Sequence, residues 1–250
     1  MSEEVKDVEV KEAEVKEAEV KETPKKKSFI TESKLEILIA IFLGITMVLT
    51  AWATWIGSLH GGNQATNYTK SNNISSDANS MYNEAAQNVM QDMMLWNTIT
   101  DYKFDMVLAE AKGEQTEVTL IEQKIDQIVA DSCSESFQEA IEWALSQETE
   151  ASPFDKEGYI DSYYEEANAK LSEAQALLEE GMQDNKNGDT YNLVTVIYSL
   201  VLFLLGIVGI FKNIPNRFVV FIIAVIILII ATVFMVQIPM PTGFDIGSYF

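Results

Sequence analysis

Few side chains in this sequence could do chemistry, and they stand far apart. The single histidine, His60, lies in a Leu-His-Gly-Gly segment, and the single cysteine is Cys133. One Cys and one His fall short of a four-ligand zinc site, and a lone cysteine closes no intramolecular disulfide. His60 has no acidic neighbour in sequence, so we interpret it as an interfacial histidine. The alternative is a pH sensor, since histidine titrates near neutral pH. We interpret Cys133 as a small filler residue, with a bridge between two subunits as the alternative.

One stretch, Asp155–Asp161, is similar to the middle of an EF-hand calcium loop, with Gly158 at the turn. The register fails at both ends, because position 1 would be Pro153 and position 12 would be Tyr164. This stretch therefore predicts a helix N-terminus after a proline turn. The chain has no P-loop, GxSxG, HExxH or GxGxxG motif. We predict no catalytic, cofactor-binding or metal-binding residue, no cofactor and no enzymatic activity.

Two N-glycosylation sequons begin at Asn67 and Asn73. They matter only if the host glycosylates exported proteins.

Three uninterrupted apolar runs are the elements that determine where the other segments of the chain lie. They cover residues 35–57, 191–211 and 218–238, and each has about the 20 residues that a helix needs to cross a bilayer. The runs contain no Asp, Lys or Arg, and their one Glu, Glu36, sits at an edge. Three such runs predict an integral membrane protein. The first is a retained signal anchor, because it is too long for a cleavable signal peptide.

Basic residues near the spans predict the orientation. Lys25, Lys26, Lys27 and Lys34 precede the first span, and Lys212 and Arg217 flank the turn between the second and third. The tail after the third span has no basic residue. We therefore expect a multi-pass protein of the cell membrane. The tail 1–33 and the turn 212–217 are cytoplasmic, whereas the domain 58–190 and the tail 239–250 are extracytoplasmic.

Charge is concentrated in the domain between the first two spans. Of the formal net charge of -21, residues 58–189 contribute -19, from 7 Lys and 26 acidic residues. Such a field excludes nucleic acid as a partner and favours cations or a basic protein. The simpler interpretation is a solvated, self-repelling helical surface. The first 33 residues contain Val-Lys-Glu-Ala-Glu repeats, whose period of five forms no helical seam, and we interpret them as a low-complexity tail.

Helical periodicity runs through the polar domain. A first apolar stripe steps by three and four along one helix face: Met81, Tyr82, Ala85, Val89, Met93, Trp96 and Ile99. A second steps like a coiled-coil seam: Ile160, Tyr164, Ala167, Leu171, Ala174 and Leu178. Both stripes are expected to form core. Gly113 and Gly158 mark breaks, and Ser134 is a candidate N-cap. The polar segment 61–80 is left open as helix or loop. The predicted fold is an all-α membrane protein with three transmembrane helices and an antiparallel helical bundle or coiled-coil hairpin outside.

Residues 35–238 resemble a family of small bacterial three-span membrane proteins of unknown function. The resemblance rests on Gly61-Gly62-Asn63-Gln64-Ala65 after the first span, a long helical insert, and the entry Gly188 to Tyr191 into two close-set spans. It implies the three-span architecture and no activity.

The function expected from these features is a non-enzymatic membrane protein whose outer bundle senses, scaffolds or binds a partner. The alternative is a homo-oligomeric channel built from span hydroxyls such as Thr46, Thr50, Thr54, Thr190 and Thr195. Small residues on the first span (Ala40, Gly44, Ala51 and Thr54) suit docking of the hairpin or of a second subunit. We expect a homo-oligomer that associates through the spans.

Overall fold

The computed structural model describes residues 32–211 and 214–249. All but the last two positions of the predicted tail 1–33 lie outside this part, as do the first two of the turn 212–217. The described residues form helices and no strand. In chain order these are α2 (Glu32–Lys112), α3 (Gln115–Ser132), α4 (Glu135–Leu145), η1 (Pro153–Asp155), α5 (Tyr159–Ile207), η2 (Val208–Ile210), α6 (Ile214–Val236) and η3 (Ile246–Tyr249).

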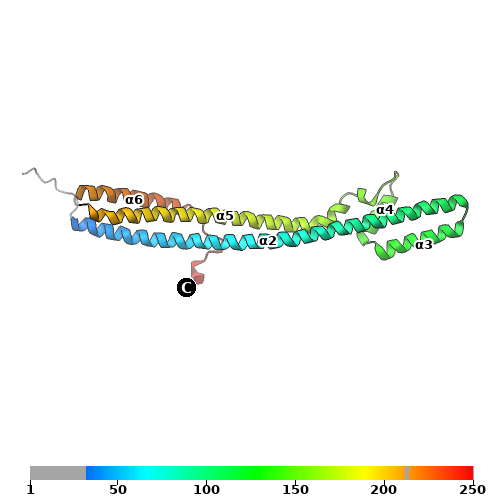
Figure 1. The fold of residues 1–250 in the computed structure, drawn as a ribbon, viewed down its shortest axis with the longest axis horizontal. Helices are drawn as coiled ribbons and strands as arrows, with labels where there is room; N and C mark the ends of the chain where they lie inside the picture. The colour runs from blue at the N-terminus through cyan, green and yellow to red at the C-terminus, as the bar shows by residue number, and fades with distance from the viewer. Residues whose placement is uncertain (1–31, 212–213, 250) are drawn as a thin grey trace, which may run out of the picture. The chain divides into compact units, whose positions relative to one another are not determined.

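Three helices, α2, α5 and α6, each contain a stretch long and apolar enough to cross a membrane. The predicted all-helical membrane protein with three spanning segments is confirmed to that extent. The chain divides into two compact units. Unit 1 comprises residues 1–59 and 187–250 and holds all three apolar stretches, and unit 2 comprises residues 60–186 (Figure 1).

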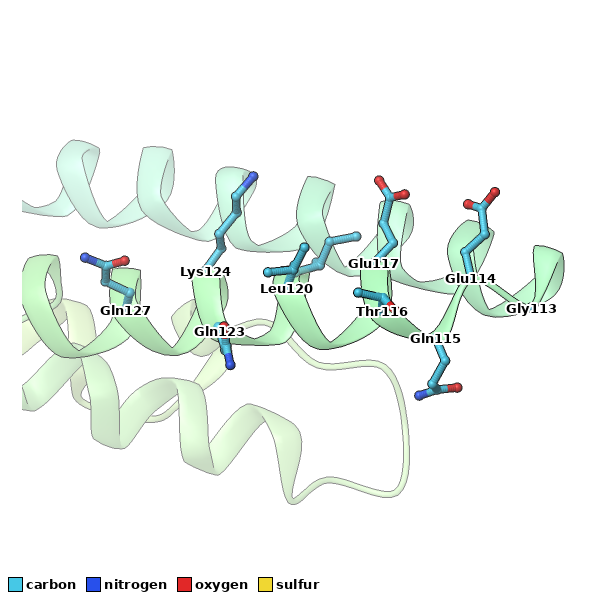
Figure 2. A pocket seen from close by; sticks show the side chains of 10 residues that line it. Gly113, Glu114, Gln115, Thr116, Glu117, Leu120, Gln123, Lys124 and Gln127 are labelled. Atoms are coloured by element: carbon cyan, nitrogen blue, oxygen red, sulfur yellow. The ribbon is translucent and has the colours of Figure 1, made fainter.

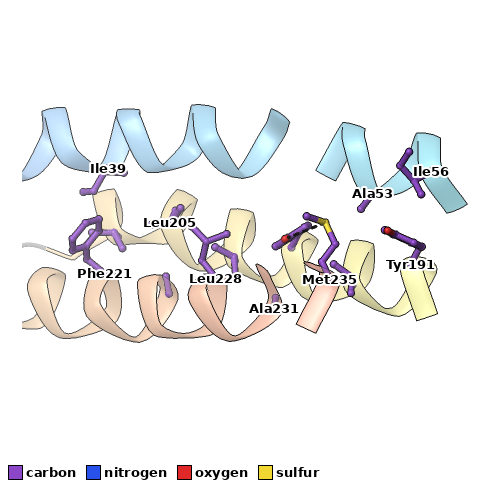
Figure 3. Close-up of a cluster of buried hydrophobic side chains, with 14 of the residues drawn as sticks. Ile39, Ala53, Ile56, Tyr191, Leu205, Phe221, Leu228, Ala231 and Met235 are labelled. Carbon is purple, nitrogen blue, oxygen red and sulfur yellow. Dashed lines mark hydrogen bonds between the residues drawn. The ribbon is translucent and has the colours of Figure 1, made fainter. Parts of the chain in front are cut away.

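Unit 1 is built on a line of buried side chains from each of three helices (Figure 3). On α5 and α6 the buried positions alternate in steps of three and four. They are Val194, Tyr198, Val201 and Leu205 on α5, continued by Val208 at the start of η2, and Phe221, Ala224, Leu228, Ala231 and Met235 on α6. The apolar stretches of both helices are apolar all round, so packing between helices, and not amphipathicity, decides which face is buried there. The remaining faces expose large apolar side chains, as a lipid-facing surface should.

The small-residue face of the first span takes no part in this packing. Ala40, Gly44, Ala51 and Thr54 are all exposed, and a Cβ added at Gly44 would meet nothing within 4 Å. From the sequence, this face is expected to be covered by the hairpin of the second and third spans or by a second subunit. The hairpin does not cover it. A different glycine makes the close approach: a Cβ at Gly57 would lie 3.2 Å from the Cβ of Tyr191.

Helix α6 begins at Ile214, four residues before the predicted span, and this places Arg217 inside the helix. The Arg217 side chain is buried. Its Nη1 donates to Glu32 Oε1 at 3.0 Å, and its Nη2 lies 3.6 Å from Glu36 Oε1. The Nε has no hydrogen-bond partner among the described residues. The Arg217 cluster, made of these three residues, therefore joins the start of α6 to the start of α2.

Unit 2 turns at the predicted breaks. Gly113 and Gly158 both have φ of +77°, a backbone conformation that favours glycine. Gly113 follows α2, and Gly158 precedes α5. Ser134 caps α4 by accepting a hydrogen bond from the Phe137 N–H at 3.2 Å, as predicted. Ser152 caps the short η1 helix that starts at Pro153.

The polar segment left open by the sequence is helical. Gly61 and Gly62 lie inside α2, which continues without interruption to Lys112, and α5 likewise runs unbroken from Tyr159 to Ile207. Within unit 2 the two helices are joined by the Ser71 hydroxyl, which donates to the Ala174 carbonyl at 2.7 Å. The ring centroids of Tyr82 and Tyr164 lie 4.6 Å apart.

The prediction that the apolar stripe of α2 forms core is partly wrong. Ala85, Val89 and Ile99 are buried, but Tyr82 and Met93 are exposed. The buried position after Val89 is occupied by Asp92, which is only 5% exposed. A carboxylate can take this place because donors on α5 satisfy it, as described below. On α5, Ala167 and Ala174 are buried and the other seam residues are half-buried, so this line does face the interior.

Candidate functional site

The most polar buried group of unit 2 is the Asp92 carboxylate. The hydroxyls of Tyr159 and Tyr163 both donate to its Oδ2, each at 2.6 Å. The two hydroxyls lie 3.4 Å from each other. Asp92 comes from the middle of α2 and both tyrosines from the first turns of α5, where the helix step of four places them on one face. Short hydrogen bonds from two donors to one oxygen are typical of an ionised carboxylate.

Aromatic rings and Cys133 lie in the same buried cluster as Tyr159. Tyr159 lies 6.0 Å from both Phe137 and Phe154, measured between ring centroids. Burial raises the pKa of the Tyr159 hydroxyl, and its hydrogen bond to Asp92 raises that pKa further. Burial, with a smaller contribution from the charge of Asp92, also raises the pKa of the Cys133 thiol. At neutral pH the thiol is therefore protonated and a poor nucleophile, which suits a structural cysteine.

His60 has an acidic partner that sequence proximity did not reveal. Its Nδ1 lies 2.7 Å from Asp184 Oδ1, and both residues are buried within unit 2. The two positions are 124 residues apart along the chain, on α2 and α5. The pair joins these helices and satisfies both polar groups. The interpretation of His60 as a simple interfacial residue therefore omitted its main contact.

The other residues singled out in the sequence take ordinary positions. Asp155 accepts a hydrogen bond from the Ser152 N–H at 2.8 Å, which completes the capping box of η1. The helix start predicted within Asp155–Asp161 is that of α5, at Tyr159. Asn67 and Asn73 lie within α2, half-buried and exposed respectively. In the described part of the chain no three His, Cys, Asp or Glu side chains come close enough to hold a metal ion.

The hydroxyls that suggested a channel mostly bond their own helix. Thr46, Thr50 and Thr54 each donate to the carbonyl four residues earlier, at 2.7–2.8 Å. Thr195 donates to the Tyr191 carbonyl at 3.0 Å. Thr46 is fully buried.

Unit 2 carries a wide polar hollow of about 920 Å³ beside the α2–α3 turn and along α3. Figure 2 shows its side chains diverging: Glu117 and Lys124 point to one side of α3, and Gln115 and Gln123 to the other. A ligand site needs polar groups that converge. This hollow does not provide them.

A smaller cavity of about 270 Å³ lies among α2, α3 and α4. Half of its lining residues are branched aliphatic, including Ile99, Ile125 and Ile141, and four are polar or charged. Lys103 lies at this cavity with its Nζ 5.1 Å from the centroid of the Trp96 ring, and burial lowers the pKa of that amine.

An unexplained feature of unit 2 is exposed apolar surface on α2, beside the buried face of that helix. We name it the outer stripe. Its members are between 42% and 66% exposed: Met90, Met93, Met94, Phe104, Val107 and Leu108. A shallow hollow of about 360 Å³ follows its first part, lined by Gln87, Met90, Gln91, Met94, Leu95 and Thr98. At 100° per residue, Asp92 and Ile99 project about 130–150° away from the centre of the outer stripe, whereas Val89 lies in line with Val107 at the edge of the stripe. In this segment α2 is therefore apolar well beyond its buried face.

The sequence interpretation missed the buried Asp92 carboxylate and the outer stripe. It assigned Met93 to the core and did not use the exposed positions Met90, Met94, Phe104 and Leu108. The available signal was the number of apolar residues between Met90 and Leu108, more than one buried face can take.

Comparisons with known proteins give no relative. No family model, no curated protein and no solved structure matches the chain. The resemblance to a bacterial three-span family therefore stays a prediction, and functional arguments rest on the residues alone.

Proposed function

We propose that this protein is a non-enzymatic, multi-pass protein of the cell membrane, and that unit 2 stands outside the cytoplasm and binds a protein partner through the outer stripe. The stripe is the observation that carries the proposal. The stripe consists of two apolar groups, at 90–94 and 104–108, with the exposed Asn97, Thr100 and Asp101 between them. Soluble domains rarely leave this many large apolar side chains on one side of a helix in water unless something covers them. Here the row lies outside the apolar stretches, so lipid is not its expected cover.

The chemistry of the other buried groups supports binding over catalysis. Asp92 and His60 each have a partner at 2.6–2.7 Å that holds a helix pair together. Cys133 is buried and protonated at neutral pH. These groups are engaged in stabilising unit 2, and we assign them no reaction.

The proposed orientation follows the basic flanks of the spans. Lys34 and Arg217 belong to the end of unit 1 where α2 and α6 begin. Positive residues are retained on the cytoplasmic side, so this end faces inward. Unit 2 and the C-terminal tail are then extracytoplasmic.

A photo-crosslinking experiment in intact cells tests partner binding. A photoreactive residue replaces Phe104 in the stripe, and in a matched variant it replaces Leu120, an equally exposed apolar residue on α3. We expect a discrete crosslinked polypeptide at position 104, absent at position 120 and lost when Met94→Lys is added. Equal products at both positions, or none at position 104, would refute the proposal.

We also propose that copies associate through the spans. The exposed small-residue face around Gly44 supports this, since small residues allow close helix approach in lipid. Mass measurement in nanodiscs should show an oligomer that Gly44→Leu weakens. A monomer at every protein concentration would contradict it.

A further inference from the structure

The outer stripe has the dimensions of a helix-binding surface. Its members recur at positions 90, 93, 94, 104, 107 and 108, on one side of α2. At 1.5 Å per residue the stripe spans about 27 Å, the length of a helix of about 18 residues. Exposed methionines are typical of surfaces that receive apolar side chains of varied shape, because the thioether chain adapts easily.

Charge around the stripe selects the partner. Between Met90 and Leu108 the exposed charged residues on α2 are Asp101 and Asp105, and both lie on or beside the stripe. The one lysine of this segment, Lys103, is half-buried one helical turn before Val107, and its Nζ lies 5.1 Å from the centroid of the Trp96 ring. Within the stripe the exposed charges on α2 are therefore negative, and the exposed Lys112 lies one turn beyond Leu108.

Unit 2 as a whole has the same sign. Residues 60–186 contain 7 Lys and 25 acidic residues, a formal charge of -18. A second copy of unit 2 would meet this charge with an equal one, which opposes a stripe-to-stripe dimer. An anionic lipid surface would be repelled for the same reason.

We infer that the outer stripe binds a cationic amphipathic helix, with the apolar face of that helix on Met90, Met94, Phe104 and Leu108 and its lysines or arginines beside Asp101 and Asp105. The inference rests on the proposed function and names the class of partner. A helix that is apolar on one face and basic on the other meets both properties of the surface. Oppositely charged rims speed encounter, and the apolar row slows dissociation.

The test uses the full chain in phosphatidylcholine nanodiscs and a synthetic 18-residue helix with leucines on one face and lysines on the other. Its matched control has every lysine replaced by glutamate, and empty nanodiscs correct for binding to lipid. We expect saturable one-to-one binding of the lysine helix and none of the glutamate helix.

Two pairs of variants locate the binding. Met94→Ser with Phe104→Ser should weaken binding at least tenfold, because both side chains leave water in the complex. Leu120→Ser with Leu145→Ser, which removes two equally exposed leucines elsewhere, should leave it unchanged. Asp101→Asn with Asp105→Asn should weaken binding about threefold to tenfold at low salt, and the difference should vanish in about 0.5 M salt. Glu122→Gln with Glu173→Gln is the charge-matched control, since both glutamates are exposed elsewhere in unit 2.

The outcomes separate this inference from the proposed function. Equal binding of both peptides, no binding, or binding unaffected by the stripe variants would overturn the inference. So would self-association of nanodisc-embedded protein that the stripe variants abolish, because the occupant would then be a second copy. If crosslinking at position 104 succeeds while the lysine helix fails, the partner exists but is not a cationic helix. If crosslinking also fails, the proposed function falls with it.

Discussion

Replacing Asp92 should loosen unit 2 around Cys133. In Asp92→Ala the hydroxyls of Tyr159 and Tyr163 lose their acceptor. Tyr159 is buried, so its donor is left without water, at a cost of about 1–3 kcal/mol. Tyr163 is half-buried and can reach solvent, so we count about half of that cost. Removing a buried charge returns part of the total, because the carboxylate no longer needs desolvation. The net loss is about 2–3 kcal/mol.

The single cysteine makes this measurable in the intact protein. Cys133 is buried beside Asp92, so alkylation requires local opening. A loss of about 2–3 kcal/mol corresponds to a rate increase of about 30- to 150-fold, at tenfold per 1.4 kcal/mol. The assay follows alkylation of the full chain in nanodiscs at neutral pH by mass spectrometry.

Asp92→Asn is the control, because loss of the charge alone also speeds alkylation. The Asp92 charge raises the pKa of the Cys133 thiol, so either substitution lowers that pKa and increases the thiolate fraction. Asn keeps an acceptor for the tyrosines and should give only this smaller increase. If Asp92→Ala alkylates no faster than Asp92→Asn, the hydrogen bonds do not stabilise unit 2 and the reasoning is wrong.

Three further predictions follow from other contacts. Because the pKa of Tyr159 is raised above its usual 10.0, only the unfolded state releases this proton as pH rises past 10. Stability should therefore fall above about pH 10, and it should fall less in Tyr159→Phe. Thermal melts of both proteins at pH 8 and 11 test this, and an equal loss of stability in the two proteins would contradict it. Gly181→Ala should destabilise unit 2 by about 1–3 kcal/mol, because its Cβ would lie 2.6 Å from the Tyr68 ring. Gly181→Ala with Tyr68→Ala should recover part of this loss in the same melts, and no recovery would exclude the clash as its cause. In a variant without the native cysteine, an impermeant thiol reagent on intact cells should label a cysteine at Ser76 and not one at Asn213; the opposite pattern would reverse the orientation.

Local signals predicted the elements of the fold because each depends on neighbouring residues. The apolar runs predicted three spans, and Gly113, Gly158 and Ser134 marked turns that the structure contains. Gly61 and Gly62 left the start of the polar domain open, although glycine is tolerated within a helix at a cost of about 1 kcal/mol.

The buried polar pairs could not be predicted, because their partners are distant in sequence. Helical periodicity treats an aspartate as a surface residue. The prediction therefore places Met93 in the core, whereas the structure buries Asp92 at that point of the helix. Its donor Tyr159 lies 67 residues away, and Asp184 lies 124 residues from His60. No local pattern encodes such pairings. The outer stripe was hidden for another reason: methionines at helical spacing were assigned to the core before their exposure was known.

The Arg217 cluster has a consequence for how the protein is made. Arg217 belongs to the last span and its partner Glu32 to the start of the first, 185 residues earlier. The carboxylates of Glu32 and Glu36 must therefore stay in solvent during synthesis until α6 arrives, which the water-exposed edge of a bilayer permits and its interior does not. Once formed, the cluster fixes the depth of α6 in the bilayer, because sliding inward would carry a paired guanidinium into hydrocarbon. Of the three helices with an apolar stretch, α6 is made after α2 and α5, and its arrival thus completes this end of unit 1.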